Sequence, residues 1–420
     1  MKRYDSYKDS GVEWIGEVPS HWENCRFKDF LKLSTVASND VHKIGLENIE
    51  SATGRFIETN TEFEGNGVGF KKNSVVYGKL RPYLQKVWLA EFEGNAVGDF
   101  FVFNAKKNSW PLYIKYLMLS DGFTKEADGS TFGAKMPRVS SDFILTLHFC
   151  LPPIIEQQTI ASYLDKKCSE IDKVISAQQK RIALLQELKQ SVITHAVTKG
   201  LNPNVEMKDA GMEWIGNVPS HWNNLRLRFV CELRNGYTPS KANPDFWEDG
   251  TIPWYRMEDI RECGRKLKEA KQYITEEAVK GGGLFEAGSF ILATTATIGE
   301  HAVLIVDSLA NQQFTNLKIR KSLSQRMLGD YFFYYLYMVD DYCKATTKTS
   351  TFPAVSMELL KNCHVVFPTI KEQYKIIEYL DKKCASINSS LSKAQHQVEL
   401  LQEYKQSLIT EVVTGKRNVS

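Results

Sequence analysis

The sequence predicts a mixed α/β fold in which two domains are joined by two long helices. The helices are expected to pair as an antiparallel coiled coil, with a pseudo-twofold internal repeat. Three observations support this prediction. A long amphipathic segment occurs twice, a short tryptophan motif occurs twice, and a region of mixed strand-like and helix-like stretches lies between each motif and the helix that follows it. The chain of 420 residues is long enough for two domains with separate cores.

The tryptophan motif opens each half of the chain. Residues 9–22 recur at 209–222, and Trp14, His21 and Trp22 are among the identical positions. A catalytic role for the repeated histidine would require two sites, and no partner triad is visible in the sequence. A structural histidine between tryptophans is therefore the preferred interpretation.

The regions after the motif, roughly 23–150 and 223–366, share little sequence. We place the first domain at 1–150, the first long helix at 151–200, the second domain at 201–366, and the second long helix with its tail at 367–420. Composition and alternation predict strands at 74–77, 87–89, 100–103, 289–292 and 302–306, and helices at 112–119 and 330–342. Both regions end alike, because Pro137 and Pro353 begin matching segments 216 residues apart.

The long segments carry the clearest signal. Residues 151–200 and 367–416 share 25 of 50 positions. In both, apolar residues alternate at spacings of four and three over more than four heptads, which indicates a coiled-coil seam. A core helix packed on its own domain is the alternative, and the unbroken spacing disfavours it. The seam residues that we expect to pair the helices or to dock a partner are Leu164, Ile171, Ile175, Ile182, Leu185, Leu380, Ile387, Leu391, Val398 and Leu401.

Composition limits the class of protein. The net charge of +3 permits nucleic-acid binding without indicating it, and no apolar run reaches the length of a membrane span. The N-terminus lacks the apolar region of a signal peptide, and the eight cysteines are scattered. We therefore expect a cytoplasmic protein with reduced thiols and no membrane association.

Catalytic and metal-binding motifs are not found. The segment 243–246 lacks the second proline of an amine methyltransferase motif, and two acids with a lysine at 245–271 arise easily by chance as a nuclease-like set. The segment 65–69 lacks the lysine of a phosphate loop, so we interpret it as a turn. The sequence predicts no catalytic residue and no metal site in this chain.

Basic stretches without acids occur in both domains, interleaved with aromatic or hydroxyl residues. Such stretches suit a polyanion, because basic groups neutralise phosphate while amides and arginine forks can read base edges. Each charge alone is more often a solvated surface group, so the prediction depends on the recurrence. The DNA-binding candidates are Lys71, Lys72, Lys79, Arg81, Lys135, Arg138, Thr294, Thr295, Gln312, Gln313, Lys344 and Lys348. Gln312 and Gln313 could pair with adenine, and Arg81 or Arg138 with guanine.

The chain resembles the specificity subunits of type I DNA restriction–modification systems over nearly its whole length. The resemblance rests on the doubled motif at 13–22 and 213–222, the doubled helix opening, the segment Tyr77-Gly-Lys-Leu-Arg-Pro-Tyr83, and 293–299 followed by 311–313. It implies that each variable region is a target recognition domain that reads one half of a bipartite double-stranded DNA site. The helices would set the spacing and dock two modification subunits.

The resemblance also implies which partners supply the chemistry. The modification subunits would hold S-adenosylmethionine and methylate adenine, and restriction (translocase) subunits would use ATP and Mg²⁺. This chain itself would hold no cofactor.

Three other classes remain open from the sequence alone. The first is a free-standing regulator that binds DNA with two tandem domains. The second is an enzyme, either a fused methyltransferase or a nuclease. The third is a coiled-coil scaffold, which the two large unlike domains disfavour.

Overall fold

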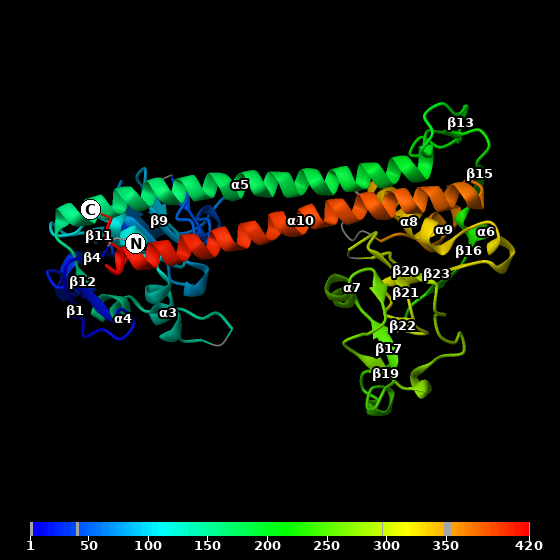
Figure 1. The fold of residues 1–420 in the computed structure, drawn as a ribbon. Coiled ribbons are helices and arrows are strands. Elements are labelled where there is room, and N and C mark those ends of the chain that lie inside the picture. Colours follow the sequence, from blue (N-terminus) through cyan, green and yellow to red (C-terminus); the bar gives the residue numbers. More distant parts are fainter. Residues whose placement is uncertain (1–2, 39–41, 134, 296, 348–353, 420) are drawn as a thin grey trace. The chain divides into compact units, whose positions relative to one another are not determined.

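The computed structural model describes residues 3–38, 42–133, 135–295, 297–347 and 354–419. The chain divides into two compact units (Figure 1). Unit 1 comprises residues 1–181 and 394–420, and unit 2 comprises residues 182–393. Each long helix therefore contributes one part to each unit.

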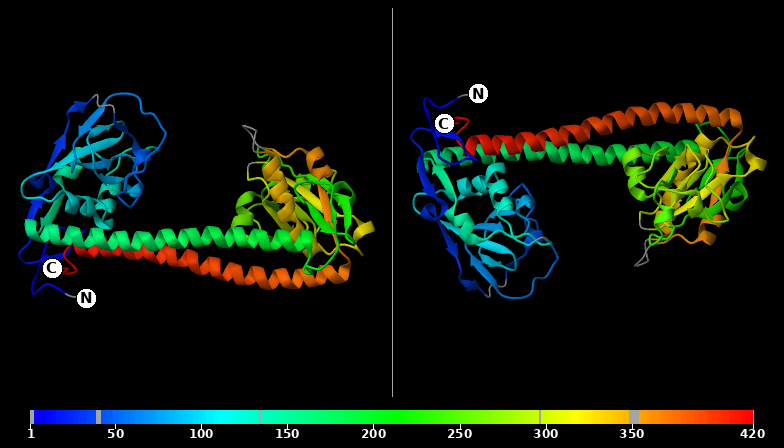
Figure 2. Two further views of the ribbon diagram at one scale, coloured as in Figure 1. Left: turned by 90° about the horizontal axis from the view of Figure 1, so that it is seen from above. Right: turned by 90° about the horizontal axis from the view of Figure 1, so that it is seen from below.

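The two long helices confirm the strongest prediction from the sequence. Helix α5 (Ile154–Lys199) has 46 residues and helix α10 (Ile370–Val413) has 44. Gly200 and Gly415, with φ of +75° and +73°, follow their last turns in the left-handed conformation that commonly ends a helix. Within each unit the two helix segments pack side by side in opposite directions, so the helices form the antiparallel coiled coil (Figure 2).

The heptad seam lies on the packed side of both helices. None of the ten predicted seam residues is exposed. Leu164 and Leu380, which occupy equivalent positions in the two copies, are both fully buried. Two lysines also lie on the seam. Lys405 Nζ contacts the Asp172 carboxylate at 2.8 and 3.0 Å in unit 1, and Lys189 Nζ contacts the Asn388 side-chain oxygen at 2.9 Å in unit 2. These two contacts are equivalent, because each residue of the first pair lies 216 positions from its counterpart.

Unit 1 is built on a four-stranded antiparallel sheet with the order β4-β11-β8-β9. A second small sheet has the order β5-β7-β10-β6, and two-stranded ribbons join β1 to β2 and β3 to β12. The elements are β1 (Tyr7–Asp9), β2 (Glu17–Pro19), β3 (Glu23–Arg26), α1 (Phe27–Phe30), β4 (Leu31–Ser34), β5 (Ala37–Ser38), β6 (Lys43–Ile44), η1 (Leu46–Asn48), β7 (Gly67–Phe70), β8 (Val75–Gly78), η2 (Pro82–Leu84), β9 (Val87–Leu89), β10 (Gly94–Ala96), β11 (Phe100–Ala105), α2 (Pro111–Met118), α3 (Asp121–Gly129), α4 (Ser141–Thr146) and β12 (His148–Leu151).

Unit 2 repeats this frame although its sequence differs. Its main sheet has the order β16-β23-β20-β21-β18, in which the first four strands match those of unit 1 and β18 is added in parallel at the edge. The elements are β13 (Met207–Asp209), β14 (Asn217–Pro219), β15 (Asn223–Arg226), α6 (Leu227–Val230), β16 (Cys231–Asn235), η3 (Pro244–Phe246), β17 (Ile252–Tyr255), α7 (Met257–Cys263), β18 (Lys266–Leu267), β19 (Tyr273–Ile274), η4 (Glu276–Ala278), β20 (Phe290–Ala293), β21 (His301–Leu304), β22 (Leu309–Ala310), β23 (Phe314–Ile319), η5 (Lys321–Leu323), α8 (Gly329–Thr347), α9 (Met357–Asn362) and β24 (His364–Phe367).

One local prediction was wrong. The glycine-rich segment 65–69 was expected to be a turn, and residues from Gly67 onward form strand β7 instead. A Cβ atom at Gly67 would lie 2.2 Å from the carbonyl oxygen of Ala96, so glycine at this position allows the close approach of β7 to β10. Gly67 is explained by the packing of β7 against β10, which the spacing of glycines in the sequence does not reveal.

Side chains in the repeated segments of the long helices form hydrogen bonds that attach each sheet domain to the helix that follows it. In unit 1, Glu156 accepts hydrogen bonds from the Trp22 indole (3.2 Å) and contacts Nε2 of His21 (2.7 Å). Asp165 accepts a hydrogen bond from the Tyr116 hydroxyl at 3.0 Å. Unit 2 repeats these contacts, with Glu372 bound to Trp222 and His221 and with Asp381 bound to Tyr334.

A buried glutamine forms a third set of hydrogen bonds between each domain and its helix. Gln157 has no exposed surface, accepts a hydrogen bond from the Trp110 amide at 2.8 Å, and donates to the carbonyl oxygens of Asn108 and Pro152. Gln373 does the same in unit 2 with the Leu328 amide and the carbonyls of Arg326 and Pro368. Each domain is therefore attached to the first turns of the helix that follows it by side chains that satisfy buried polar groups.

Candidate nucleic-acid interface

Three segments of unit 1 meet at one edge of its main sheet. The residue after β8, Lys79, donates its amide to the carbonyl of Asp99, which precedes β11, and accepts from the amide of Val139. Leu80 forms an isolated bridge with Arg138. We call this place the first corner, made of residues 79–81, 99 and the described part of 132–138. It brings together Lys79, Arg81, Lys135 and Arg138, four of the residues predicted to bind DNA.

An acid that the sequence search did not select organises the charges of the first corner. Arg138 donates to both carboxylate oxygens of Asp99, from Nε and Nη2, each at 3.0 Å. Lys79 Nζ lies 3.7 Å from the same carboxylate. The hydrogen bond from Arg138 holds the pKa of the Asp99 carboxyl below its usual value, so Asp99 is ionised at neutral pH. The corner is a fixed arrangement of two cations around one anion.

The rest of the first corner is exposed and partly apolar. Arg81 is exposed and has a φ of +52°, and its amide donates to the carbonyl of Pro137 at 2.8 Å. A non-glycine residue in this left-handed region is uncommon and often occurs at functional sites. Phe132 of the corner and Tyr83, two residues beyond Arg81, expose 61% and 51% of their surface, as rings available for stacking on a sugar or a base do.

The structure does not bring Lys71 and Lys72 to this corner. Both are exposed and lie in the turn before β8, whereas Lys79 follows that strand. At about 3.3 Å per residue, the length of a strand separates the two groups by more than 10 Å. The basic stretch 71–86 therefore contains two separate sets of charges.

Unit 2 contains a backbone arrangement equivalent to the first corner. The Thr294 amide donates to the carbonyl of Gln313, the Val355 amide donates to the carbonyl of Thr294, and Thr295 forms a bridge with Ala354. We call residues 294–295, 311–313 and 354–355 the second corner. It brings together Thr294, Thr295, Gln312 and Gln313, all predicted from the sequence to contact DNA.

The side chains of the second corner carry no charge. Thr294 is buried, and its hydroxyl lies 3.5 Å from the Thr315 hydroxyl, which donates to Asn235. Gln312 is exposed, and its side-chain oxygen accepts from Thr238. Ala354 occupies the place that Arg138 has in unit 1. The two corners thus share a backbone frame and differ completely in side-chain chemistry.

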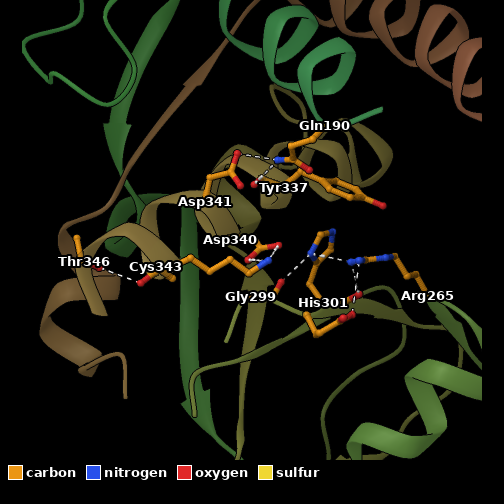
Figure 3. A network of polar contacts seen from close by, with 11 residues as sticks. Gln190, Arg265, Gly299, His301, Tyr337, Asp340, Asp341, Cys343 and Thr346 are labelled. Carbon is orange, nitrogen blue, oxygen red and sulfur yellow. Dashed lines mark hydrogen bonds and ion pairs between the residues drawn. The ribbon is translucent and has the colours of Figure 1, made fainter. Parts of the chain in front are cut away.

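A polar network surrounds Gly299, which follows the second corner along the chain (Figure 3). Gly299, with a φ of +91°, lies so close to Asp340 that a Cβ atom would overlap its carboxylate. Lys344 Nζ pairs with Asp340 at 2.8 Å, and Gln190 of α5 donates to Asp341 at 2.7 Å. The candidate Lys344 is therefore engaged in a structural ion pair. The candidate Lys348 lies outside the described residues.

His301 lies at the centre of this network and is fully buried. Arg265 Nη1 lies 3.0 Å from His301 Nδ1, and Arg265 also stacks over the Tyr337 ring at 4.8 Å. Burial, followed by the charge of Arg265, lowers the pKa of His301 well below its ordinary value. The imidazole is therefore neutral in the folded protein over the physiological pH range.

We expect unit 2 to lose stability as pH falls below about 6.5, the ordinary pKa of histidine. His301 then binds a proton in the unfolded chain and stays neutral in the folded one. This favours unfolding by about 1 kcal/mol between pH 7.5 and 5.5. Urea unfolding of the wild type and of His301→Gln at both values measures it, and the variant should have the flatter dependence. Burial raises the pKa of Asp340, which makes the free energy of unfolding change with pH in the opposite direction. The wild type and His301→Gln both contain Asp340, so this contribution cancels in the comparison. Equal pH dependence in the two proteins would contradict the assignment.

Sites of other kinds are not found in the part of the chain that the structure describes. No group of three or more histidine, cysteine, aspartate or glutamate side chains there could hold a metal ion. Among the same residues, no helix has the length and apolar character that a membrane span requires.

Comparisons with known proteins show similarity to one family. Residues 219–400 match the profile of the type I restriction modification DNA specificity domain. The specificity subunit of the type I restriction enzyme EcoprrI from Escherichia coli is 42% identical over 165 residues, which are 38% of this chain and 41% of that subunit. The specificity subunit of MjaVIII from Methanocaldococcus jannaschii is 22% identical over an alignment that covers 96% of this chain and 94% of that subunit. Residues 219–400 thus match the DNA specificity domain of type I restriction–modification systems, and the chain as a whole is similar to their specificity subunits.

The fold agrees with this similarity. A solved structure from a study of complex assembly and conformational transition in the type I restriction–modification system superposes with a TM-score of 0.72. The likeness covers 94% of this chain and 98% of that chain at 16% identity, so it supports the fold alone. The aligned part of the EcoprrI subunit is less than half its length, although the archaeal subunit is matched almost throughout.

Two features of the corners were not predicted from the sequence. Asp99 was not among the predicted residues, because the prediction depended on stretches without acids and Asp99 lies outside them. The equivalence of the two corners was also not predicted, because residues 79–81 and 99 share no sequence with residues 294–295 and 313. One signal was available, since the matching segments that begin at Pro137 and Pro353 end each corner.

Proposed function

We propose that this chain is the DNA-recognition subunit of a type I restriction–modification complex, in which each unit reads one half of a bipartite DNA site. The observation that carries the proposal is the pair of corners. They repeat one backbone frame with unlike side chains, as two readers of different half-sites require. Basic and amide side chains at an exposed sheet edge suit phosphate neutralisation and base readout.

The catalytic chemistry is assigned to partner subunits. In this proposal the chain acts in the cytoplasm as a non-catalytic subunit and holds no cofactor. Modification subunits supply S-adenosylmethionine for adenine methylation, and restriction subunits supply ATP and Mg²⁺ for translocation and cleavage. The chain contributes sequence selection and the geometry of assembly.

The long helices are proposed to set the spacing of the half-sites and to dock two modification subunits. Helix α5 runs unbroken for 46 residues, roughly 70 Å at 1.5 Å per residue. Leu184 and Leu188 expose 65% and 49% of their surface on α5, and the equivalent Leu400 and Tyr404 both expose 49% on α10. Apolar side chains exposed at equivalent positions of an internal repeat support docking of two copies of one partner.

Genome-wide mapping of N6-methyladenine, with and without the gene for this chain, tests the proposal. We expect a bipartite motif, two short defined sequences separated by an undefined spacer, to disappear when the gene is deleted. The methyltransferase gene is kept intact as the control. A free-standing regulator would leave every methylated motif in place while transcription changes, and that result would contradict the proposal.

A further inference from the structure

The two hydrogen bonds from Arg138 to Asp99 leave part of the Arg138 guanidinium without a partner among the described residues. Arg138 uses Nε and one hydrogen of Nη2 on the carboxylate, and a guanidinium carries five N–H groups in one plane. The end of the plane, formed by Nη1 and the second hydrogen of Nη2, therefore still presents two parallel donors. Guanine presents two acceptors, O6 and N7, on its major-groove edge, and paired arginine donors match them.

Asp99 holds those donors in a fixed direction. An arginine side chain loses considerable rotamer freedom when it binds, and an ion pair already formed in the free protein removes part of that loss before DNA arrives. Asp99 is itself anchored, because its carbonyl accepts the Lys79 amide at 2.9 Å and Lys79 Nζ lies near its carboxylate. The side chains of Arg138 and Asp99 are 36% and 22% exposed, so the guanidinium can be reached from solvent.

The other cations of the first corner are less suited to base readout. Lys79 and Lys135 are point charges without a fork, which fits contact with phosphate. Arg81 has no side-chain hydrogen-bond partner among the described residues that would fix its direction. Only Arg138 combines a fork, a carboxylate that holds it, and access from solvent.

We propose that Arg138, held by Asp99, reads a guanine in the half-site bound by unit 1. The inference rests on the proposed function and names one base pair of that site. The second corner cannot read its half-site in this way, because Ala354 stands at the place equivalent to Arg138.

The test uses the assembled complex with its modification subunits and DNA duplexes that contain the mapped motif. Each guanine of the motif is replaced in turn by 7-deazaguanine, which lacks the N7 acceptor. For the wild type we expect one replacement, in a single half-site, to weaken binding about 2- to 12-fold, because it removes one of the two hydrogen bonds of a bidentate contact. Arg138→Ala should bind more weakly and should be insensitive to that one replacement. It should remain sensitive to replacements in the other half-site.

Two further variants keep the test decisive. Arg138→Met retains the aliphatic stem, so it serves if the alanine variant fails to assemble. Lys135→Ala, an exposed cation in the same segment, should weaken binding to all duplexes alike and keep the response to 7-deazaguanine. The inference is wrong if the first half-site contains no G·C pair, or if the Arg138 variants respond to every replacement as the wild type does. The proposed function fails separately, if no bipartite motif depends on the gene.

Discussion

Replacing Gln157 by alanine is expected to lower the free energy of unfolding by about 4 kcal/mol. The substitution removes three hydrogen bonds from a side chain without exposed surface. The Trp110 amide and the carbonyls of Asn108 and Pro152 would then lack their partner. Leaving a buried polar group unsatisfied costs about 1–3 kcal/mol each, and partial access of water reduces the sum. Urea unfolding of the full-length chain, followed by tryptophan fluorescence, measures the change.

Gln158, the residue after Gln157, provides a matched control for this prediction. Gln158 is exposed on the same helix turn, so Gln158→Ala should change the free energy of unfolding by less than about 0.5 kcal/mol. Gln373→Ala should reproduce the loss in unit 2, because Gln373 makes the equivalent three contacts. If Gln157→Ala proves as mild as Gln158→Ala, the glutamine does not fasten the domain to the helix.

The parts of the fold that follow from periodicity were predictable from the sequence. An apolar stripe maintained over more than four heptads has few structural explanations, and its duplication predicted the pairing of α5 and α10. The positions of the main strands were predicted to within a few residues for β8, β9, β11 and β20. These strands are short apolar runs bounded by polar residues, which is the pattern that sequence reading detects best.

The contacts between distant segments were not predictable, because no local pattern encodes them. Asp99 and Arg138 lie 39 positions apart, and their fork depends on how the loop before β11 meets the segment after α3. The meaning of the repeated glutamine was hidden for the same reason. The dipeptide Glu-Gln was visible in both helices, but two of the three backbone groups that Gln157 satisfies lie nearly fifty residues earlier. The repeat marked Gln157 and Gln373 as equivalent residues, and the structure shows which backbone groups they bind.

The ion pair between Lys405 and Asp172 on the coiled-coil seam is expected to contribute strongly to stability. Asp172→Ala is expected to lower the free energy of unfolding by about 3 kcal/mol. The side chains of Lys405 and Asp172 are 8% and 13% exposed, and loss of the carboxylate would leave the Lys405 ammonium without its counter-charge on the seam. Breaking a buried ion pair by removing one partner typically costs about 3–5 kcal/mol, and the small exposure of Asp172 places this case at the lower end. The midpoint of urea unfolding reports the loss.

The internal repeat supplies the control for this ion pair as well. Lys189 meets Asn388 at the equivalent place in unit 2, where the partner is neutral and the contact is more exposed. Asn388→Ala should therefore cost only about 1 kcal/mol, the usual contribution of one hydrogen bond.

Adding Lys405→Met to Asp172→Ala should recover most of the lost stability, since an apolar side chain of similar length needs no counter-charge. Recovery would assign the loss to the unpaired ammonium. A double variant as unstable as Asp172→Ala alone would show instead that Asp172 acts through packing, and that the lysine on the seam is solvated without it.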